Sequence, residues 1–298
     1  MIKKKYCQLP NGETLAYLEL GEAHHETLVL LHGNMSSGVH YKPILSSLAE
    51  TFHVIAPDLR GFGDSTYDTP IESIGDFSED LKQFLDVQSL ETVHLGGWSA
   101  GGMVAMRFAA DYPNLVKSLI LIASGSYKGF PIYEKDAHYQ PIIGKQYTSK
   151  AAMATDPVQV VPVAMALEQK NTTLMKQIWA AAIYNTGLPE EDDFNLYISE
   201  TMKQRNLIDL DWALMQFNMS TEHNGVSEGD GSIAKITCPV LALYGDKDLA
   251  VTEAMFQETV QALPNVTKKI YPDVGHSPIS AVPESMVNDL RMFMQLDR

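Results

Sequence analysis

A serine flanked by two glycines lies at an abrupt change in the sequence pattern. Residues 92–95 (Thr-Val-His-Leu) begin a short apolar run, residues 97–101 (Gly-Trp-Ser-Ala-Gly) follow it, and residues 102–109 have a helix-like pattern. A serine at a strained strand-to-helix turn is typical of a G-x-S-x-G nucleophile elbow, which exposes the hydroxyl. The two glycines are expected to relieve crowding there, because they have no Cβ. The sequence therefore predicts that Ser99 is a catalytic nucleophile.

A serine hydroxyl needs a base to take its proton, and a third group must orient that base. Among the nine histidines, His276 fits best, because it lies in a short glycine-containing loop after the strand-like run 268–271. The expected acid follows an earlier apolar run, where two aspartates lie close together. We predict that Asp248, three residues past Gly245, holds the imidazole, and that Asp246 binds local backbone or faces solvent.

The oxyanion of an acyl-transfer reaction must be met by fixed N–H donors. One is expected from the backbone of Ala100, which follows the nucleophile at the start of a helix, where N–H groups have no intrahelical partner. The other is expected from the loop 32–38, where Asn34 is the first choice and Met35 the alternative. His32 in the same loop is predicted to be structural.

Strand-like and helix-like runs alternate through the first and last parts of the chain. This alternation predicts an α/β protein, with a mostly parallel sheet and helices on both faces. An initial hairpin is expected over 6–20, around an Asn-Gly turn. A helix containing Phe77 is expected to be capped by Asp76 or Ser78. The expected strands are 27–31, 52–56, the short run that precedes the turn at Ser99, 119–123, 240–244 and 268–271, and the last helix is expected over 283–296.

The alternation stops over residues 126–231, where no strong strand pattern occurs. We predict that this segment is an inserted helical cap, and that residues 1–125 and 232–298 form one core domain. The segment contains two of the three tryptophans and six of the methionines, so an apolar small-molecule pocket beneath it is plausible. Its expected helices are 157–169, 174–184, 194–205 and 211–219.

Composition excludes several classes of function. A formal charge of −15 argues against nucleic-acid binding and against adsorption to anionic membranes. No apolar run approaches the ~20 residues that a membrane-spanning helix requires. Two cysteines cannot form a disulfide scaffold for 298 residues. We therefore expect a soluble, cytoplasmic protein that acts on a small molecule; the sequence predicts no oligomeric state.

Five short motifs in a fixed order resemble the α/β-hydrolase fold superfamily. Within it, they are similar to the capped serine hydrolases, which include esterases, lactonases and carbon–carbon bond hydrolases. The resemblance covers residues 12–296 apart from the expected cap. The motifs are His32-Gly33, residues 58–65 (Asp-Leu-Arg-Gly-Phe-Gly-Asp-Ser), residues 97–102 (Gly-Trp-Ser-Ala-Gly-Gly), Gly245-x-x-Asp248 and Gly275-His276.

The resemblance implies an α/β-hydrolase fold with an eight-stranded sheet and a triad of Ser99, His276 and Asp248. It also implies oxyanion donors on Asn34 and Ala100, and neither a metal nor an organic cofactor. The function that it implies is hydrolysis of a small, largely apolar carboxylic ester or lactone through an acyl-enzyme.

Some features of the sequence leave other functions open. The start of the loop, His-Gly-Asn, resembles that of haloalkane dehalogenases, but their nucleophile is an aspartate, so Ser99 disfavours dehalogenase and epoxide-hydrolase chemistry. Carbon–carbon bond hydrolysis and acyl transfer could use the same triad with a different pocket. A ligand-sensing receptor with slow turnover is an alternative of another class, because an intact triad does not exclude it.

Overall fold

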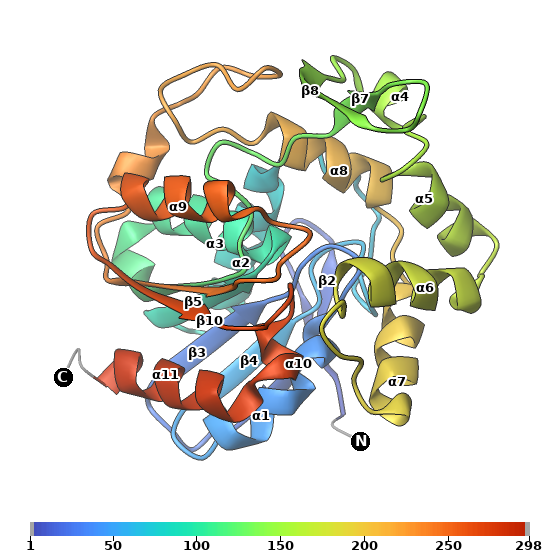
Figure 1. Ribbon diagram of the computed structural model, residues 1–298. Helices are drawn as coiled ribbons and strands as arrows, with labels where there is room; N and C mark the ends of the chain where they lie inside the picture. Colours follow the sequence, from blue (N-terminus) through green and yellow to red (C-terminus); the bar gives the residue numbers. More distant parts are fainter. Residues whose placement is uncertain (1–2, 296–298) are drawn as a thin grey trace.

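An eight-stranded, mostly parallel sheet forms the centre of the molecule (Figure 1). The computed structural model describes residues 3–295. The strands are ordered β1-β2-β4-β3-β5-β6-β9-β10; β2 is antiparallel to β1 and β4, and the other neighbours are parallel. Their bounds are β1 (Lys5–Gln8), β2 (Thr14–Leu20), β3 (Thr27–Leu31), β4 (His53–Pro57), β5 (Val93–Trp98), β6 (Val116–Ile122), β9 (Val240–Gly245) and β10 (Val266–Tyr271).

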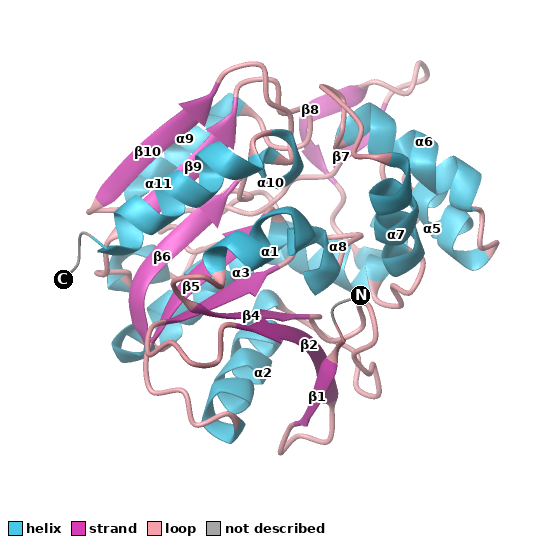
Figure 2. Ribbon diagram, turned by 90° about the horizontal axis from the view of Figure 1, so that it is seen from below, coloured by secondary structure: helices cyan, strands magenta, loops and turns pink. Residues whose placement is uncertain are grey.

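Two layers of helices enclose this sheet. Helices α2, α3 and α9 cover one face, and α1 and α11 cover the other (Figures 1 and 2). Strands β3, β5 and β9 are therefore buried along their whole length, which explains the largely apolar sequences of β3 and β9. The helices outside the middle segment are η1 (Gly38–Tyr41), α1 (Lys42–Leu48), α2 (Ile74–Val87), α3 (Ala100–Asp111), η2 (Pro113–Leu115), η3 (Ser232–Lys235), α9 (Glu253–Ala262), α10 (Pro278–Ala281) and α11 (Pro283–Gln295).

The predicted α/β architecture and mostly parallel eight-stranded sheet are confirmed. The start of α2 differs from the prediction. The helix begins at Ile74, and the Asp76 carboxylate accepts a 2.9 Å hydrogen bond from the backbone N–H of Ser73, the residue that precedes the helix. Ser78 lies inside the helix and donates instead to Asp111. The final helix is confirmed up to Gln295, while residue 296 of the expected range lies outside the described residues.

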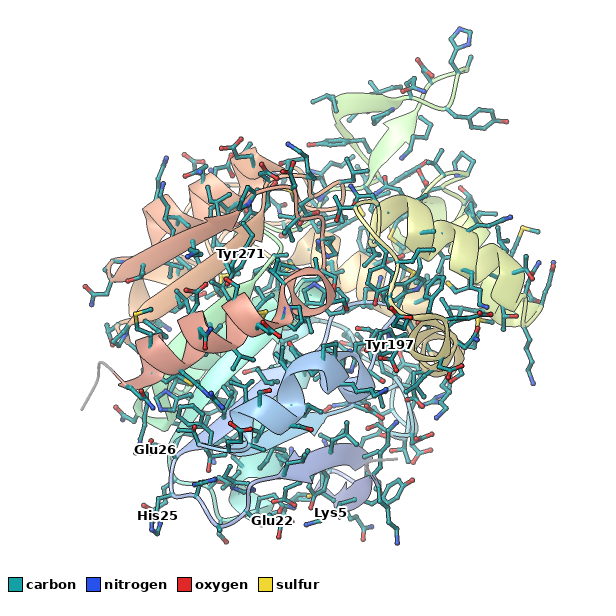
Figure 3. The ribbon with its side chains drawn as sticks, turned by 60° about the horizontal axis from the view of Figure 1, so that its bottom comes forward. Lys5, Glu22, His25, Glu26, Tyr197 and Tyr271 are labelled. Atoms are coloured by element: carbon teal, nitrogen blue, oxygen red, sulfur yellow. The ribbon has the colours of Figure 1, made fainter. Side chains whose placement is uncertain are left out.

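Between β6 and β9 the chain leaves the sheet, and five α-helices form there among the described residues, in addition to η3. The prediction of a helical segment without a strong strand is incomplete, because β7 and β8 form an antiparallel hairpin that projects outward (Figure 3). The elements are β7 (Tyr133–Lys135), β8 (Pro141–Gln146), α4 (Lys150–Met153), α5 (Val161–Glu168), α6 (Thr172–Ala182), α7 (Glu191–Thr201) and α8 (Leu207–Gln216).

The carboxyl ends of the parallel strands meet at one edge of the sheet, as they must when strands run in the same direction. The loops that follow β3, β5, β9 and β10 therefore gather there, although they are far apart in the sequence. These four loops carry the residues that the sequence singled out. Over residues 3–295, no helix is both long and apolar enough to cross a bilayer.

Candidate active site

Ser99 lies at a strained turn between β5 and α3. Its backbone angles are φ 55° and ψ −120°, a conformation that residues with a side chain seldom adopt. Close backbone contacts hold the turn. A Cβ on Gly97 would lie 2.2 Å from the Gly101 carbonyl oxygen, and a Cβ on Gly101 would lie 2.2 Å from that of Leu31. Both positions therefore require glycine, for the steric reason expected from the sequence.

A buried aspartate and a buried histidine form a direct pair beside this turn. The His276 Nδ1 lies 2.8 Å from the Asp248 Oδ2, and both side chains have at most 2 % exposure. The other carboxylate oxygen, Oδ1, accepts hydrogen bonds from the N–H groups of Ala250 and Val251 at 2.8 and 2.9 Å. The carboxylate therefore has fixed partners on both oxygens, and it holds Nδ1 so that the Nε2 side of the ring is left for another group.

Asp246, the alternative acid, has a different environment. Its side chain is partly exposed and accepts a 2.7 Å hydrogen bond from the backbone N–H of Asp273. The Asp248–His276 pair lies close to the elbow, since the Trp98 indole N–H donates a 2.8 Å hydrogen bond to the His276 carbonyl oxygen. In the described part of the chain, the Ser99 hydroxyl and the His276 ring are not hydrogen-bonded to each other. Such catalytic hydrogen bonds often tighten only when substrate binds.

The loop after β3 is held rigidly against Ser99. His32 Nε2 accepts a 2.9 Å hydrogen bond from the N–H of Leu59, so the ring proton lies on Nδ1, which donates to the Gly33 carbonyl oxygen at 2.8 Å. The Ser36 hydroxyl donates to the same oxygen at 2.7 Å. Complete burial lowers the pKa of His32 to about 3, which keeps the ring neutral. A Cβ on Gly33 would lie only 2.9 Å from the Ser99 Cβ.

Two backbone N–H groups remain available beside Ser99. Within residues 3–295, neither the Asn34 nor the Ala100 N–H has a hydrogen-bond acceptor. The Met35 N–H, in contrast, donates to the Asn34 Oδ1 at 2.8 Å. The peptide between Gly33 and Asn34 is trans, so fixing its carbonyl oxygen also fixes the N–H on the opposite side. These contacts favour Asn34 over Met35 as the second donor.

The segment between β6 and β9 contacts this loop through side chains. Gln204 Nε2 donates to the Asn34 Oδ1 at 2.8 Å, and the Asn34 Nδ2 donates to the Asp211 Oδ1 at 3.0 Å. The Thr201 hydroxyl donates to the Met35 carbonyl oxygen. Helices α7 and α8 and the residues between them therefore position the loop together with the sheet.

A cavity of about 330 Å³ opens onto these groups. Ser99, Ala100, Asn34 and His276 lie in its wall, and most of the remaining wall is apolar. Much of the apolar wall comes from the segment between β6 and β9. The apolar residues of that segment at the cavity are Phe130, Ile132, Val158, Pro162, Val163, Ile178, Trp179, Ala182, Ile183, Leu207 and Leu214.

One acidic residue of the cavity wall was missed from the sequence. Asp211 is 7 % exposed, and the prediction placed it only within a helix. The spacing of Leu207, Leu210 and Leu214 gives a signal that could have found it. These leucines define the buried face of α8, and position 211 falls on that face, where an unpaired acid is unusual.

An aromatic stack lies behind the cavity. The His40 ring is stacked between Trp179 of α6 and Tyr197 of α7, at centroid distances of 5.1 and 4.8 Å. Tyr197 points from α7 toward the main body of the fold (Figure 3). Burial lowers the pKa of His40 to about 3, so the ring is neutral. This stack helps to position the wall of the cavity.

A cluster of three carboxylates, from Asp58, Asp64 and Glu200, has oxygens close enough together to hold a cation. The Lys4 ammonium already lies 2.7 Å from an oxygen of each of them. The lysine supplies the positive charge that this cluster needs, and it joins the start of the chain to α7. We therefore interpret the cluster as an ion-pair network.

Comparisons with known proteins agree with this architecture. A sequence model of the α/β hydrolase fold matches residues 26–280, and the chain belongs to this family. It is 23 % identical over 296 residues to "Lipase 1" of Psychrobacter immobilis, covering 98 % of this chain and 84 % of that protein. It is 24 % identical over 279 residues to a pimeloyl-[acyl-carrier protein] methyl ester esterase of Aliivibrio fischeri, covering 92 % and 95 %.

Solved structures show the same fold. The enol-lactonase from Burkholderia xenovorans LB400 superimposes with a TM-score of 0.73 over 98 % of this chain and 100 % of that one, at 15 % identity. Taken with the family match, these similarities identify the protein as an enzyme, a hydrolase of the α/β-hydrolase type.

Proposed function

We propose that the protein hydrolyses carboxylic esters or lactones of small, largely apolar molecules through an acyl-enzyme. Ser99 is the nucleophile, His276 the general base, and Asp248 the group that orients the histidine. The backbone N–H groups of Asn34 and Ala100 stabilise the oxyanion. The observation that carries this proposal is the buried 2.8 Å Asp248–His276 pair at the same apolar cavity as the serine of the elbow.

In the first half-reaction, the Ser99 Oγ attacks the carbonyl carbon while the His276 Nε2 takes the hydroxyl proton. The carbonyl oxygen becomes an oxyanion between the two backbone N–H groups, which are fixed before the reaction and therefore need no rearrangement. The histidine then gives the proton to the leaving alkoxide, and an acyl-serine remains. In the second half-reaction, water loses a proton to the same nitrogen and attacks the acyl carbon. The bond to the Ser99 Oγ then breaks, the histidine returns the proton to this oxygen, and the acid is released.

Residues 126–231 would act as a cap in this proposal. Several of their side chains line the cavity that contains the serine, so substrate would have to enter beneath or beside them. The predominantly apolar wall supports an apolar acyl or alcohol group, because burial of such a group gains roughly 25 cal/mol per Å². The names of the similar proteins, a lipase, a methyl ester esterase and an enol-lactonase, support ester or lactone substrates.

The proposal includes a small-molecule partner and a cytoplasmic location. The acidic composition, with a formal charge of −15, supports the absence of a nucleic-acid partner. The low cysteine content is consistent with a reducing compartment.

The test is hydrolysis of p-nitrophenyl esters of increasing acyl length, and of lactones, by the native protein and by Ser99→Ala. We expect the variant to lose activity by about 10⁴- to 10⁶-fold. Its melting temperature should change little, because the hydroxyl has no hydrogen-bond partner among the described residues. The chain-length optimum would report the size of the cavity. Native protein that is folded but inactive on all of these substrates would refute ester and lactone hydrolysis.

A further inference from the structure

Five polar residues line the apolar cavity. Ser99, His276 and Asn34 belong to the proposed machinery, while Gln159 and Asp211 do not. The Gln159 side-chain oxygen is already engaged by the Lys135 ammonium at 3.1 Å. Asp211 is therefore the polar residue of the cavity wall whose role the proposed reaction leaves unexplained.

The carboxyl group of Asp211 is only partly satisfied. Its Oδ1 accepts the 3.0 Å hydrogen bond from the Asn34 Nδ2, but Oδ2 has no protein partner in the range 3–295. None of the described lysines, arginines and histidines forms an ion pair with it. Asp211 is only 7 % exposed and lines the cavity, so this unpartnered oxygen is a natural position for a polar group of a ligand.

The charge state of Asp211 is compatible with two kinds of partner. Burial is the main cause that raises its pKa to about 7, and the negative charge of Asp156 contributes in the same direction. Near neutral pH the group can therefore be protonated and donate to a hydroxyl oxygen, or ionised and accept from a hydroxyl or an ammonium. An ammonium would supply the opposite charge that Asp211 lacks.

We propose that Asp211 is a specificity-determining residue, which recognises a hydroxyl or an ammonium group on the substrate. The inference rests on the proposed ester hydrolysis and narrows its substrate class. Because Asp211 contacts the side chain of Asn34, whose N–H is assigned to the oxyanion, the recognised group lies near the reacting carbonyl. The rest of the substrate fills the apolar part of the cavity. Substrates of this class are hydroxy esters and amino esters with an apolar chain.

The experiment compares three sets of methyl esters of matched chain length: unsubstituted, with a hydroxyl at successive positions, and with an amine at the same positions. Acid release is followed by titration at constant pH for the native protein, Asp211→Ala and Asp211→Asn. Asp209→Asn is the matched control. Asp209 is on the same helix, but it is paired with Lys150 and Tyr67 and is not part of the cavity wall.

We expect the native protein to prefer a hydroxy or an amino ester over its unsubstituted counterpart. In Asp211→Ala the ratio of their kcat/KM values should fall by about tenfold or more, whereas Asp209→Asn should leave that ratio unchanged. Asp211→Asn distinguishes recognition of a hydroxyl from recognition of an ammonium. An amide still hydrogen-bonds a hydroxyl but cannot neutralise an ammonium, so only a preference for amines should be lost.

Two results would overturn the inference. One is native protein that hydrolyses the unsubstituted esters as well as every substituted one, a result that does not depend on whether the variants fold. The other is a folded Asp211→Ala whose kcat/KM falls by the same factor on all esters, because Asp211 would then act only by positioning Asn34. Failure of the proposed function looks different: the native protein would hydrolyse none of the esters.

Discussion

The indole N–H of Trp98 donates a hydrogen bond of 2.8 Å to the main-chain carbonyl oxygen of His276. The residue that precedes the proposed nucleophile is thus tied to the residue proposed as its base. The two come from β5 and from the loop after β10, and 178 positions of sequence separate them. The bond limits how far the histidine loop can move away from the elbow. We therefore expect Trp98 to help align Ser99 with His276.

Trp98→Phe should lower kcat by about tenfold, since small misplacement of reacting groups is costly. The variant keeps an aromatic ring but removes the donor and leaves a buried carbonyl oxygen unpaired. Trp98 also lines the cavity, so KM will change too, and kcat is the diagnostic quantity. The matched control is Trp212→Phe on α8, a partly buried tryptophan that is not part of the cavity wall. An equal loss of kcat in both variants would contradict an alignment role for Trp98.

Asp248→Asn should reduce kcat by about 10⁴-fold, because it changes the histidine tautomer. The amide oxygen can replace Oδ1 as acceptor for Ala250 and Val251, which leaves the NH₂ group facing the His276 Nδ1. The ring must then carry its proton on Nε2 and cannot accept one from serine. Steady-state kinetics on the best ester measures the loss. Asp246→Asn is the control, and it should stay within about threefold of native, a difference well under 1.4 kcal/mol. A larger loss of kcat in Asp246→Asn than in Asp248→Asn would instead identify Asp246 as the acid that orients His276.

His32→Ala should lower kcat by about 10²- to 10³-fold, the loss expected when one oxyanion donor is misplaced. The ring fixes the Gly33 carbonyl oxygen and, through the same peptide plane, the Asn34 N–H. Ser36→Ala removes the second hydrogen bond to that oxygen and keeps the ring, so its effect should be smaller. Steady-state kinetics of the two folded variants would compare their kcat values with that of the native protein. A His32→Ala enzyme with native kcat would show that the peptide is held by other contacts.

Much of the fold could be predicted from the sequence, because burial leaves a local signal. The strand Thr27–Leu31 is apolar at nearly every position since helices cover both faces of the sheet, and its predicted bounds agree with the structure. The turn at Ser99 could be predicted because its two flanking glycines are required by backbone contacts of 2.2 Å. Such constraints act on single positions and can be recognised in the residue types.

Other features depend on contacts between distant segments, and the sequence pattern does not contain them. The hairpin strand Pro141–Gln146 is almost entirely exposed, so it has no alternating pattern of apolar and polar residues, and its proline and glycine weaken its strand propensity. The role of Asp211 depends on Asn34, 177 residues away in the sequence, and on a cavity that forms only when the chain is folded. The helix pattern placed Asp211 correctly in a helix but could not predict what it faces.

Asp211 also makes the stability of the protein depend on pH. Aspartate ordinarily titrates near 3.8, but in the folded protein the pKa of Asp211 is raised to about 7 by burial, with a contribution from Asp156, which is itself paired with Lys135. Between these two values the folded state holds a proton that the unfolded state has lost. The contribution of this group to the free energy of unfolding therefore falls as pH rises through this window, and it becomes constant above about 7. At roughly 1.4 kcal/mol per pH unit, the total effect is at most about 4 kcal/mol.

Asp211→Asn should remove this effect, because an amide does not ionise and its oxygen can still accept the hydrogen bond from Asn34. The variant should be more stable than the native protein at pH 8, by a margin that shrinks by about 2 kcal/mol on going to pH 5.5. Urea unfolding at the two pH values measures this margin, and Asp209→Asn, from the same helix, shows the change expected for an acid outside the cavity. A margin that is equal at both pH values would mean that Asp211 is ionised in the folded protein. Its unpaired oxygen would then carry a full negative charge into the cavity, and among the donor-bearing substrates the amino esters should be preferred.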